Sequence, residues 1–170
     1  MAKTKRLRKA KKPAPRKTAA RKRAARSLSA RSRVAATGKP KAAPRKQTFV
    51  ASHHDPAAFE QGLRRYAHYR DLGIAAATNG LARAHVIKMI PPCDPAEVSK
   101  RHYHDVEFQM IYVLKGWITG EYDGEGIVTM REGSCWLQPP KIKHTVLDYS
   151  DDCELLEIIL PADFATVELE

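Results

Sequence analysis

The sequence predicts an all-β domain of the sandwich or jelly-roll type, preceded by a basic segment that forms no domain of its own. From residue 83 onward, short runs rich in β-branched and aromatic residues follow one another at intervals of about ten residues. No long helical pattern separates these runs, and glycine or proline clusters bound most of them. Many short strands without intervening helices are typical of two antiparallel sheets that pack face to face or close into a barrel.

The charge of the chain is divided between its two parts. Of the 30 Lys and Arg residues, 19 lie within residues 3–46, whereas all 19 Asp and Glu residues lie from Asp55 onward. The formal net charge of +11 therefore combines +19 in the first part with −8 in the rest. Residues 1–47 contain few large apolar side chains, so they cannot bury enough surface to offset the entropy of ordering. We expect them to form a disordered tail.

The tail is also a candidate interaction segment. Its cations stand without a single anion, which favours non-specific binding of nucleic acid through residues 1–46 by release of counterions. No aromatic residue occurs before Phe49, so stacking on single-stranded bases is not expected. The alternative is a solvated extension without a function.

The remaining chain is long enough for one compact domain with an arm. Asp55 followed by Pro56 favours the start of a short helix, with Phe59, Leu63 and Tyr66 on one face. We therefore expect residues 48–80 to form an arm or short helix that packs on the barrel, and residues 81–170 to form the barrel itself.

The segment "EFQMIYVL" predicts a strand that is covered on both sides. Alternation places Gln109, Ile111 and Val113 on one face, while Phe108 and Tyr112 belong to the other. Both faces are largely apolar, which favours a second sheet on one side and a partner subunit on the other. We therefore expect a homodimer.

Cysteine usage and hydropathy suggest a cytoplasmic protein. Cys93, Cys135 and Cys153 are odd in number and form no CxxC pair, so we expect reduced, buried thiols. No secretory apolar segment begins the chain and no apolar run is long enough for a membrane span, so no membrane partner is expected.

Two histidines provide the first candidate chemistry. His102 and His104 are two residues apart, and on a strand both imidazoles point the same way. Such a pair can form half of a metal site, although two surface histidines beside Lys100 and Arg101 are the alternative.

Longer motifs around this pair resemble those of the cupin superfamily. "HYHDVEFQMIYVLKGW" is similar to the first cupin motif, and "GSCWLQPPKIKH" is similar to the second, with Gly133, Pro139 and His144 at its fixed positions. The resemblance covers about residues 80–160. It implies a small single-domain cupin, a double-stranded β-helix (jelly roll), with metal ligands His102, His104 and His144.

Three positions depart from the family pattern. Gln109 stands where the first motif has Glu, Lys141 where the second has Gly, and Asp148 where it often has Asn. An amide oxygen can still bind a metal ion but brings no negative charge, so we expect Gln109 to be a weaker fourth ligand or a hydrogen-bond partner. Glu107 lies nearby, but alternation points it away from Gln109, and it is not expected to replace the ligand.

The resemblance implies a divalent metal cofactor, Fe, Zn, Ni or Cu, whose identity the ligand types leave open. If the protein is an enzyme, the resemblance suggests a dioxygenase-like oxidoreductase acting on a small oxygenated substrate. One alternative is a non-catalytic cupin that binds or senses a small ligand. The other is a nucleic-acid-associated protein in which the tail is the working part.

The other candidates are interpreted as structural. Glu157 alternates with Leu155 and Ile159, so it is expected to face inward, as a salt-bridged wall residue or as a general base. Structural or solvated roles are expected for the histidines outside the motifs, and packing roles for both tryptophans: His53, His54, His68, His85, Trp117 and Trp136.

Overall fold

The computed structural model describes residues 44–62 and 64–170, and within them the fold is almost entirely β. The expected tail, residues 1–47, lies almost wholly outside the described residues. The strands are β1 (Glu60–Gln61), β2 (Ala67–Asp71), β3 (Arg83–Met89), β4 (His102–Asp105), β5 (Phe108–Lys115), β6 (Trp117–Tyr122), β7 (Gly126–Arg131), β8 (Cys135–Leu137), β9 (His144–Tyr149), β10 (Glu154–Leu160) and β11 (Ala165–Glu168). The helical elements are the 3-10 turn η1 (Pro56–Ala58) and the one-turn helices α1 (Ile74–Ala77) and α2 (Pro95–Val98).

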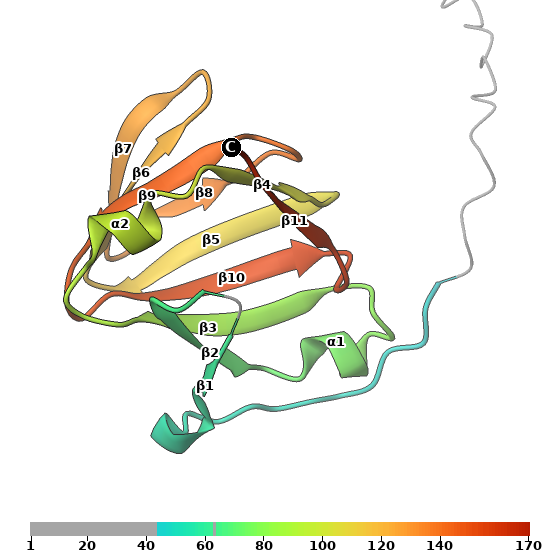
Figure 1. Ribbon diagram of the computed structural model, residues 1–170. Coiled ribbons are helices and arrows are strands. Elements are labelled where there is room, and N and C mark those ends of the chain that lie inside the picture. Colours follow the sequence, from blue (N-terminus) through green and yellow to red (C-terminus); the bar gives the residue numbers. More distant parts are fainter. Residues whose placement is uncertain (1–43, 63) are drawn as a thin grey trace, which may run out of the picture. The chain divides into compact units, whose positions relative to one another are not determined.

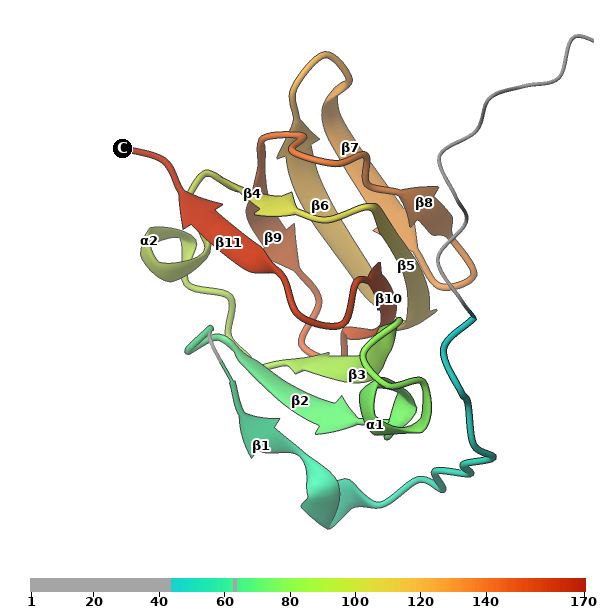
Figure 2. The ribbon, with the colours of Figure 1, turned by 90° about the vertical axis from the view of Figure 1, so that its right-hand side faces the viewer.

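The strands form two sheets, as expected for a jelly roll. The larger sheet has the order β1-β2-β3-β10-β5-β8 and the smaller has the order β11-β4-β9-β6-β7. Figure 1 shows β2, β3, β10 and β5 side by side, and Figure 2 shows the smaller sheet with the β6–β7 hairpin. All the strand pairs are antiparallel.

The arm before residue 81 differs from the expected helix. Asp55 does cap a helical turn, because its Oδ1 accepts a hydrogen bond from the Ala57 amide at 2.9 Å, but the turn ends at Ala58. The chain then enters β1 and β2, and β2 pairs with β3 over Ala67–Asp71. Phe59 and Tyr66, which were expected on one helical face, lie outside any helix, directly before β1 and β2, and the larger sheet begins well before residue 81.

The two faces of β5 have different surroundings. Gln109, Ile111 and Val113 are buried between the sheets, as alternation predicts. On the other face, Phe108 and Tyr112 remain 36% and 37% exposed. The second sheet therefore covers one face only within the described residues.

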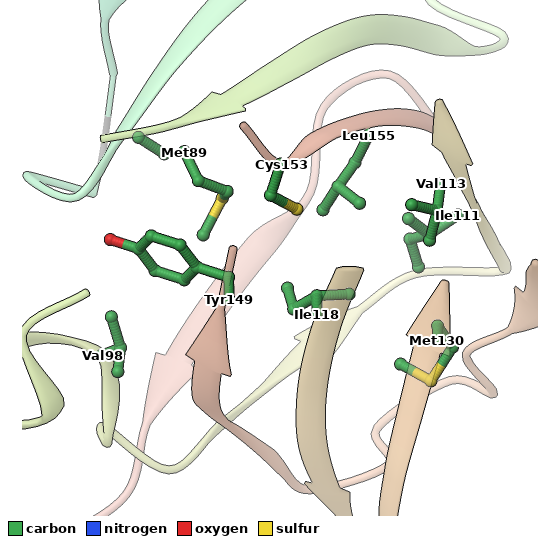
Figure 3. Close-up of a cluster of buried hydrophobic side chains, with 10 residues drawn as sticks. Met89, Val98, Ile111, Val113, Ile118, Met130, Tyr149, Cys153 and Leu155 are labelled. Atoms are coloured by element: carbon green, nitrogen blue, oxygen red, sulfur yellow. The ribbon is translucent and has the colours of Figure 1, made fainter. Parts of the chain in front are cut away.

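A cluster of buried apolar side chains joins the two sheets. Figure 3 shows Ile111, Val113 and Leu155 from the larger sheet close to Ile118 and Met130 from the smaller one. Burial of such side chains is the dominant favourable contribution to folding. The cluster fixes the distance between the sheets and so the width of the space beside it.

The motif glycines occupy backbone positions that other residues rarely adopt. Gly116 and Gly133 have φ values of 69° and 84°, and a Cβ on Gly116 would lie 2.1 Å from Ser150 Oγ. Lys141 also has a positive φ, 63°, at the position where the second motif has glycine. Among the described residues, no helix has the length and hydropathy needed to cross a membrane.

Candidate metal centre

Three histidines from the smaller sheet meet at one end of the space between the sheets. His102 and His104 lie on β4, and His144 begins β9 directly opposite His102. One ring nitrogen of each lies within 4.8 Å of the others. His102 and His144 are 4% and 6% exposed, and His104 is half-buried. These three residues are called the histidine wall below.

A hydrogen bond at Nδ1 orients each imidazole. Nδ1 of His102 donates to the carbonyl oxygen of Lys100 at 2.7 Å, and Nδ1 of His144 donates to that of Ile142 at 3.0 Å. Nδ1 of His104 is hydrogen-bonded to Thr166 Oγ1 at 2.9 Å. Such bonds fix the ring orientation and make Nε2 the atom that can accept a hydrogen bond or bind an ion, which is the usual arrangement in a metal-binding histidine.

Burial keeps these imidazoles neutral. Removal from water lowers the pKa of His102, His104 and His144 to about 4 in each case. Neutral imidazole is the form that binds a metal ion, so protons do not compete for the site near pH 7.

The opposite side of the space is built from amides and one carboxylate on the larger sheet. Gln109 on β5 is 2% exposed, and its Nε2 donates to Glu157 Oε1 at 2.6 Å. Gln138, just after β8, donates from Nε2 to Gln109 Oε1 at 3.0 Å. Glu157 on β10 lies opposite His85 on β3, and its Oε2 is 2.5 Å from His85 Nε2. Gln109, Gln138, Glu157 and His85 are called the amide wall below.

The carboxylate of the amide wall is charged and nearly buried. Burial alone would raise the pKa of Glu157, whose side chain is 12% exposed. The hydrogen bond and charge of His85 and the hydrogen bond from Gln109 outweigh that effect and lower the pKa below 4.5. Glu157 therefore faces inward as a salt-bridged wall residue, which was one of the two roles expected for it.

The two walls touch through Gln138. Its Nε2 also lies 3.0 Å from His144 Nε2, so the same amide group donates to His144 and to Gln109. The acceptor atoms, His144 Nε2 and Gln109 Oε1, are the atoms through which these two residues would bind a metal ion. An ion held by His144 and Gln109 would take the place of the Gln138 N–H groups.

The walls enclose a cavity of about 820 Å³ with aromatic side chains along its sides. Tyr69, Tyr122, Trp136 and Phe164 line it together with both walls. The volume lies in the range of pockets that hold small organic molecules. Trp136 borders the cavity and also packs against the buried apolar cluster, as expected for a core residue.

Most of the sequence predictions for the remaining residues agree with the structure, and one is wrong. Glu107 is exposed, in agreement with its exclusion from the site. His53 and His54 are exposed and His85 is the ion-pair partner of Glu157, so all three have the solvated or structural roles expected for them. Cys135 was expected to be buried, and this prediction is wrong: it lies opposite Tyr112 on the outer face of β8 and is exposed.

Gln138, Thr166 and Arg64 were missed by the sequence analysis. For Gln138 a signal was present, because alternation from Trp136 places it on the same face. Thr166 supports His104 only because β11 pairs with β4, and Arg64 reaches the cavity from the loop after β1. Nothing local in the sequence indicates either contact.

A family model described as a cupin domain matches residues 93–159. The chain carries a cupin domain. This match and the two sheets confirm the jelly roll expected from the motifs. The buried cluster of three histidines in this domain is typical of a metal site and consistent with a divalent ion.

Solved structures share the fold of the cupin domain. The polyketide cyclase RemF from Streptomyces resistomycificus is 15% identical, with a TM-score of 0.57 over 72% of this chain and 87% of that one. Oxalate decarboxylase from Bacillus subtilis is 16% identical, with a TM-score of 0.52 over 74% of this chain and 34% of that one. Salicylate 1,2-dioxygenase from Pseudoaminobacter salicylatoxidans is 8% identical, with a TM-score of 0.51 over 64% of this chain and 30% of that one.

The cupin domain thus corresponds to about a third of the decarboxylase and of the dioxygenase. No curated protein matches the sequence. At these identities the likeness establishes the fold and leaves the activity to be argued from the site.

Proposed function

We propose that the cupin domain binds a divalent metal ion on His102, His104 and His144 and is a metal-dependent oxygenase for a small oxygenated substrate. The observation that carries the proposal is the histidine wall, which consists of three neutral imidazoles. The Nδ1 atom of each imidazole is hydrogen-bonded to another group of the protein. Metal-bound imidazole nitrogens lie about 2.0–2.1 Å from the ion. One ring nitrogen of each histidine lies within 4.8 Å of the others, which supports their convergence on a single ion.

Gln109 is the proposed fourth ligand, with Glu157 behind it. The hydrogen bond from Gln109 Nε2 to Glu157 draws the amide N–H toward a buried anion, which increases the negative charge on the amide oxygen. The chain therefore retains a carboxylate one hydrogen bond away from the position where the first cupin motif has Glu. This arrangement supports an amide ligand for a dipositive ion.

The bound ion would hold and polarise an oxygenated substrate or activate oxygen, and Fe, Zn, Ni and Cu all suit imidazole ligands. The protein side chains shape the cavity and position the ligand atoms. Aromatic side chains line the cavity, and the strands of the two walls hold the ligand nitrogens and the Gln109 oxygen in place.

Metal content of the untagged, full-length protein, measured by mass spectrometry, tests the proposal. We expect close to one ion per chain in the wild type, and less than about a tenth of that in His104→Ala. His54→Ala is the matched control, because His54 is exposed and outside the site. Unchanged metal content in His104→Ala would refute the histidine wall as the binding site.

Gln109→Glu tests the fourth ligand. A carboxylate at this position should bind the ion more tightly but would lie against the anion of Glu157. We therefore expect a smaller gain in affinity for Gln109→Glu alone than for Gln109→Glu with Glu157→Gln. Equal affinities in the wild type and both variants would remove residue 109 from the ligand set.

A second candidate is a non-catalytic cupin that binds or senses a small molecule without metal. Gln138 favours it, because its amide already satisfies Gln109 and His144 and so makes a self-consistent metal-free cavity. Such a protein would lack metal when purified, and its melting temperature would rise with ligand concentration while the ligand stays intact.

The proposed partners are a second copy of the chain and nucleic acid. The exposed apolar residues Phe108, Tyr112 and Leu137 on the outer face of β5 and β8 support a homodimer. Light scattering on Leu137→Glu would then report a monomer. The 19 cations of residues 3–46 support nucleic-acid binding, and deletion of residues 1–46 should abolish retardation of duplex DNA at low salt.

A further inference from the structure

Arg64 is a buried cation in the cavity with a single side-chain partner. It lies between β1 and β2, is 9% exposed and lines the cavity. Its Nη1 donates to Glu168 Oε1 at 2.5 Å. Its Nη2 is buried and has no hydrogen-bond partner among the described residues. Its backbone is fixed, because the Arg64 carbonyl oxygen accepts from Gln61 Nε2 at 2.8 Å.

The guanidinium group of Arg64 can bind a further hydrogen-bond acceptor. Arginine stays charged at any ordinary pH, and a buried donor without a partner is unfavourable because it has lost its hydrogen bonds to water. Glu168 compensates the charge weakly, because its side chain is 59% exposed and the pair is screened by water. An oxygen anion inside the cavity would satisfy Arg64 better than Glu168 does.

Arg64 is close to the histidine wall. Its ion-pair partner Glu168 lies on β11 directly opposite His102 on β4. Burial is the main cause of the low pKa of the three imidazoles, and the positive charge of Arg64 lowers all three further. Arg64 and the three imidazoles line the same cavity, so an anionic group bound to Arg64 there would share the cavity with that wall.

We propose that the cavity binds an organic carboxylic acid in its ionised form, with its carboxylate on Arg64 in place of Glu168 and its body along the aromatic lining. This carboxylic acid would be the substrate class of the proposed oxygenase. That role rests on the proposed function, in which the same cavity also holds the metal ion. The guanidinium fork matches a planar carboxylate with two parallel hydrogen bonds. The cavity of about 820 Å³ is far larger than an inorganic anion needs.

Calorimetry on the full-length protein tests this with two acid and amide pairs, benzoate with benzamide and malonate with malonamide. Within a pair the members have nearly the same shape, so charge is the main difference. We expect at least one acid to bind about tenfold or more tightly than its amide. Inorganic phosphate is a further probe. Equal binding within both pairs, no binding of either acid, or binding of phosphate alone would overturn the proposal.

Variants separate Arg64 from its neighbours. Arg64→Gln should lose the preference for the acid, and Arg64→Lys should keep only part of it. Arg65→Gln is the matched control, because Arg65 is adjacent but exposed and is not among the residues that line the cavity. Equal effects of Arg64→Gln and Arg65→Gln would show a general charge effect and refute the site.

Glu168→Gln gives a test that does not depend on the folding of an Arg64 variant. It removes the negative charge that competes for Arg64, so the acid should bind at least as tightly as in the wild type. A structural ion pair predicts the opposite, and a weakened affinity in Glu168→Gln would overturn the proposal. Metal content measured on the same samples distinguishes the two hypotheses: metal without acid binding refutes the carboxylate, and acid binding without metal refutes the oxygenase.

Discussion

The side chains of the two cavity walls are held in place by different kinds of hydrogen-bond partner. In the histidine wall, two of the three side chains are held by backbone carbonyls, and the third is held by a threonine hydroxyl. In the amide wall, side chains are held by other side chains, from Gln138 through Gln109 and Glu157 to His85. The first wall is neutral and each of its members is hydrogen-bonded to a group outside the wall, whereas the second contains a buried charge and its members are hydrogen-bonded to one another. Damage to the histidine wall should therefore stay local, and damage to the amide wall should spread.

The largest expected effect on stability is the loss of His85. His85→Leu leaves the nearly buried carboxylate of Glu157 without its partner, and we expect a loss of about 3 kcal/mol or more in the free energy of unfolding. His104→Ala in metal-free protein should cost only about 1 kcal/mol, because it removes one neutral hydrogen bond. Urea denaturation measures both values, and equal losses would contradict the difference between the walls.

A double variant examines the coupling directly. His85→Leu with Glu157→Leu replaces the buried pair by apolar side chains, so its loss should be smaller than the sum of the two single losses. Additive losses would show that the members of the amide wall act independently.

The second effect is a separation of the two walls by pH. The ordinary pKa of histidine is 6.5 and that of the histidine wall is about 4, so on acidification the unfolded chain takes up protons first. The stability that depends on neutral imidazoles is present above pH 6.5 and is lost between pH 6.5 and 4. The pKa of Glu157 is lowered from 4.5, so its contribution is present above pH 4.5 and is lost only below it.

His104→Gln isolates one imidazole in this comparison. Between pH 7.5 and 4.5 the metal-free wild type should lose about 2 kcal/mol more stability than His104→Gln, as measured by urea denaturation at both pH values. Parallel losses in the two proteins would mean that His104 is not held neutral.

The third effect concerns Gln138, which links the walls. Gln138→Leu removes the donors that occupy Gln109 Oε1 and His144 Nε2, so these atoms become free for an ion. We expect a dissociation constant for metal that is lower by about fivefold, which corresponds to about one hydrogen bond. Titration with a competing chelator measures it, and weaker binding would instead make Gln138 a support of the site.

The smallest effect involves Lys141, whose side chain belongs to neither wall. Its positive φ is unfavourable for a residue with a Cβ by about 1 kcal/mol, while glycine loses a similar amount of backbone entropy on folding. Lys141→Gly should therefore change stability by about 0.5 kcal/mol or less, with a small gain expected. A loss above about 1 kcal/mol in thermal unfolding would assign a structural role to the Lys141–Asp105 ion pair.

The sequence predicted the histidine wall better than the amide wall, and the reason is physical. His102 and His104 share one strand, so their common direction follows from alternation alone, and the motif spacing added His144. Glu157 was placed inward by the same alternation. Its pairing with His85 depends on the register of β10 against β3, which no local pattern specifies.

The arm shows the opposite case, in which local preference was overruled by pairing. Asp55 and Pro56 are good signals for a helix start, and a helical turn does begin there. Beyond it, β2 completes the hydrogen bonds of β3, and the edge of the larger sheet decides the conformation of these residues.

The position of β11 has a consequence for how the site opens. This four-residue strand is at the edge of the smaller sheet, and within the described part of the chain it pairs with β4 alone. It carries Thr166 against His104 and Glu168 against Arg64. Short edge strands detach from a sheet more readily than its core, and their amide hydrogens exchange with solvent accordingly. Whatever occupies the cavity is therefore linked to the last strand, and hydrogen exchange at the amides of β11 should slow when the cavity is filled.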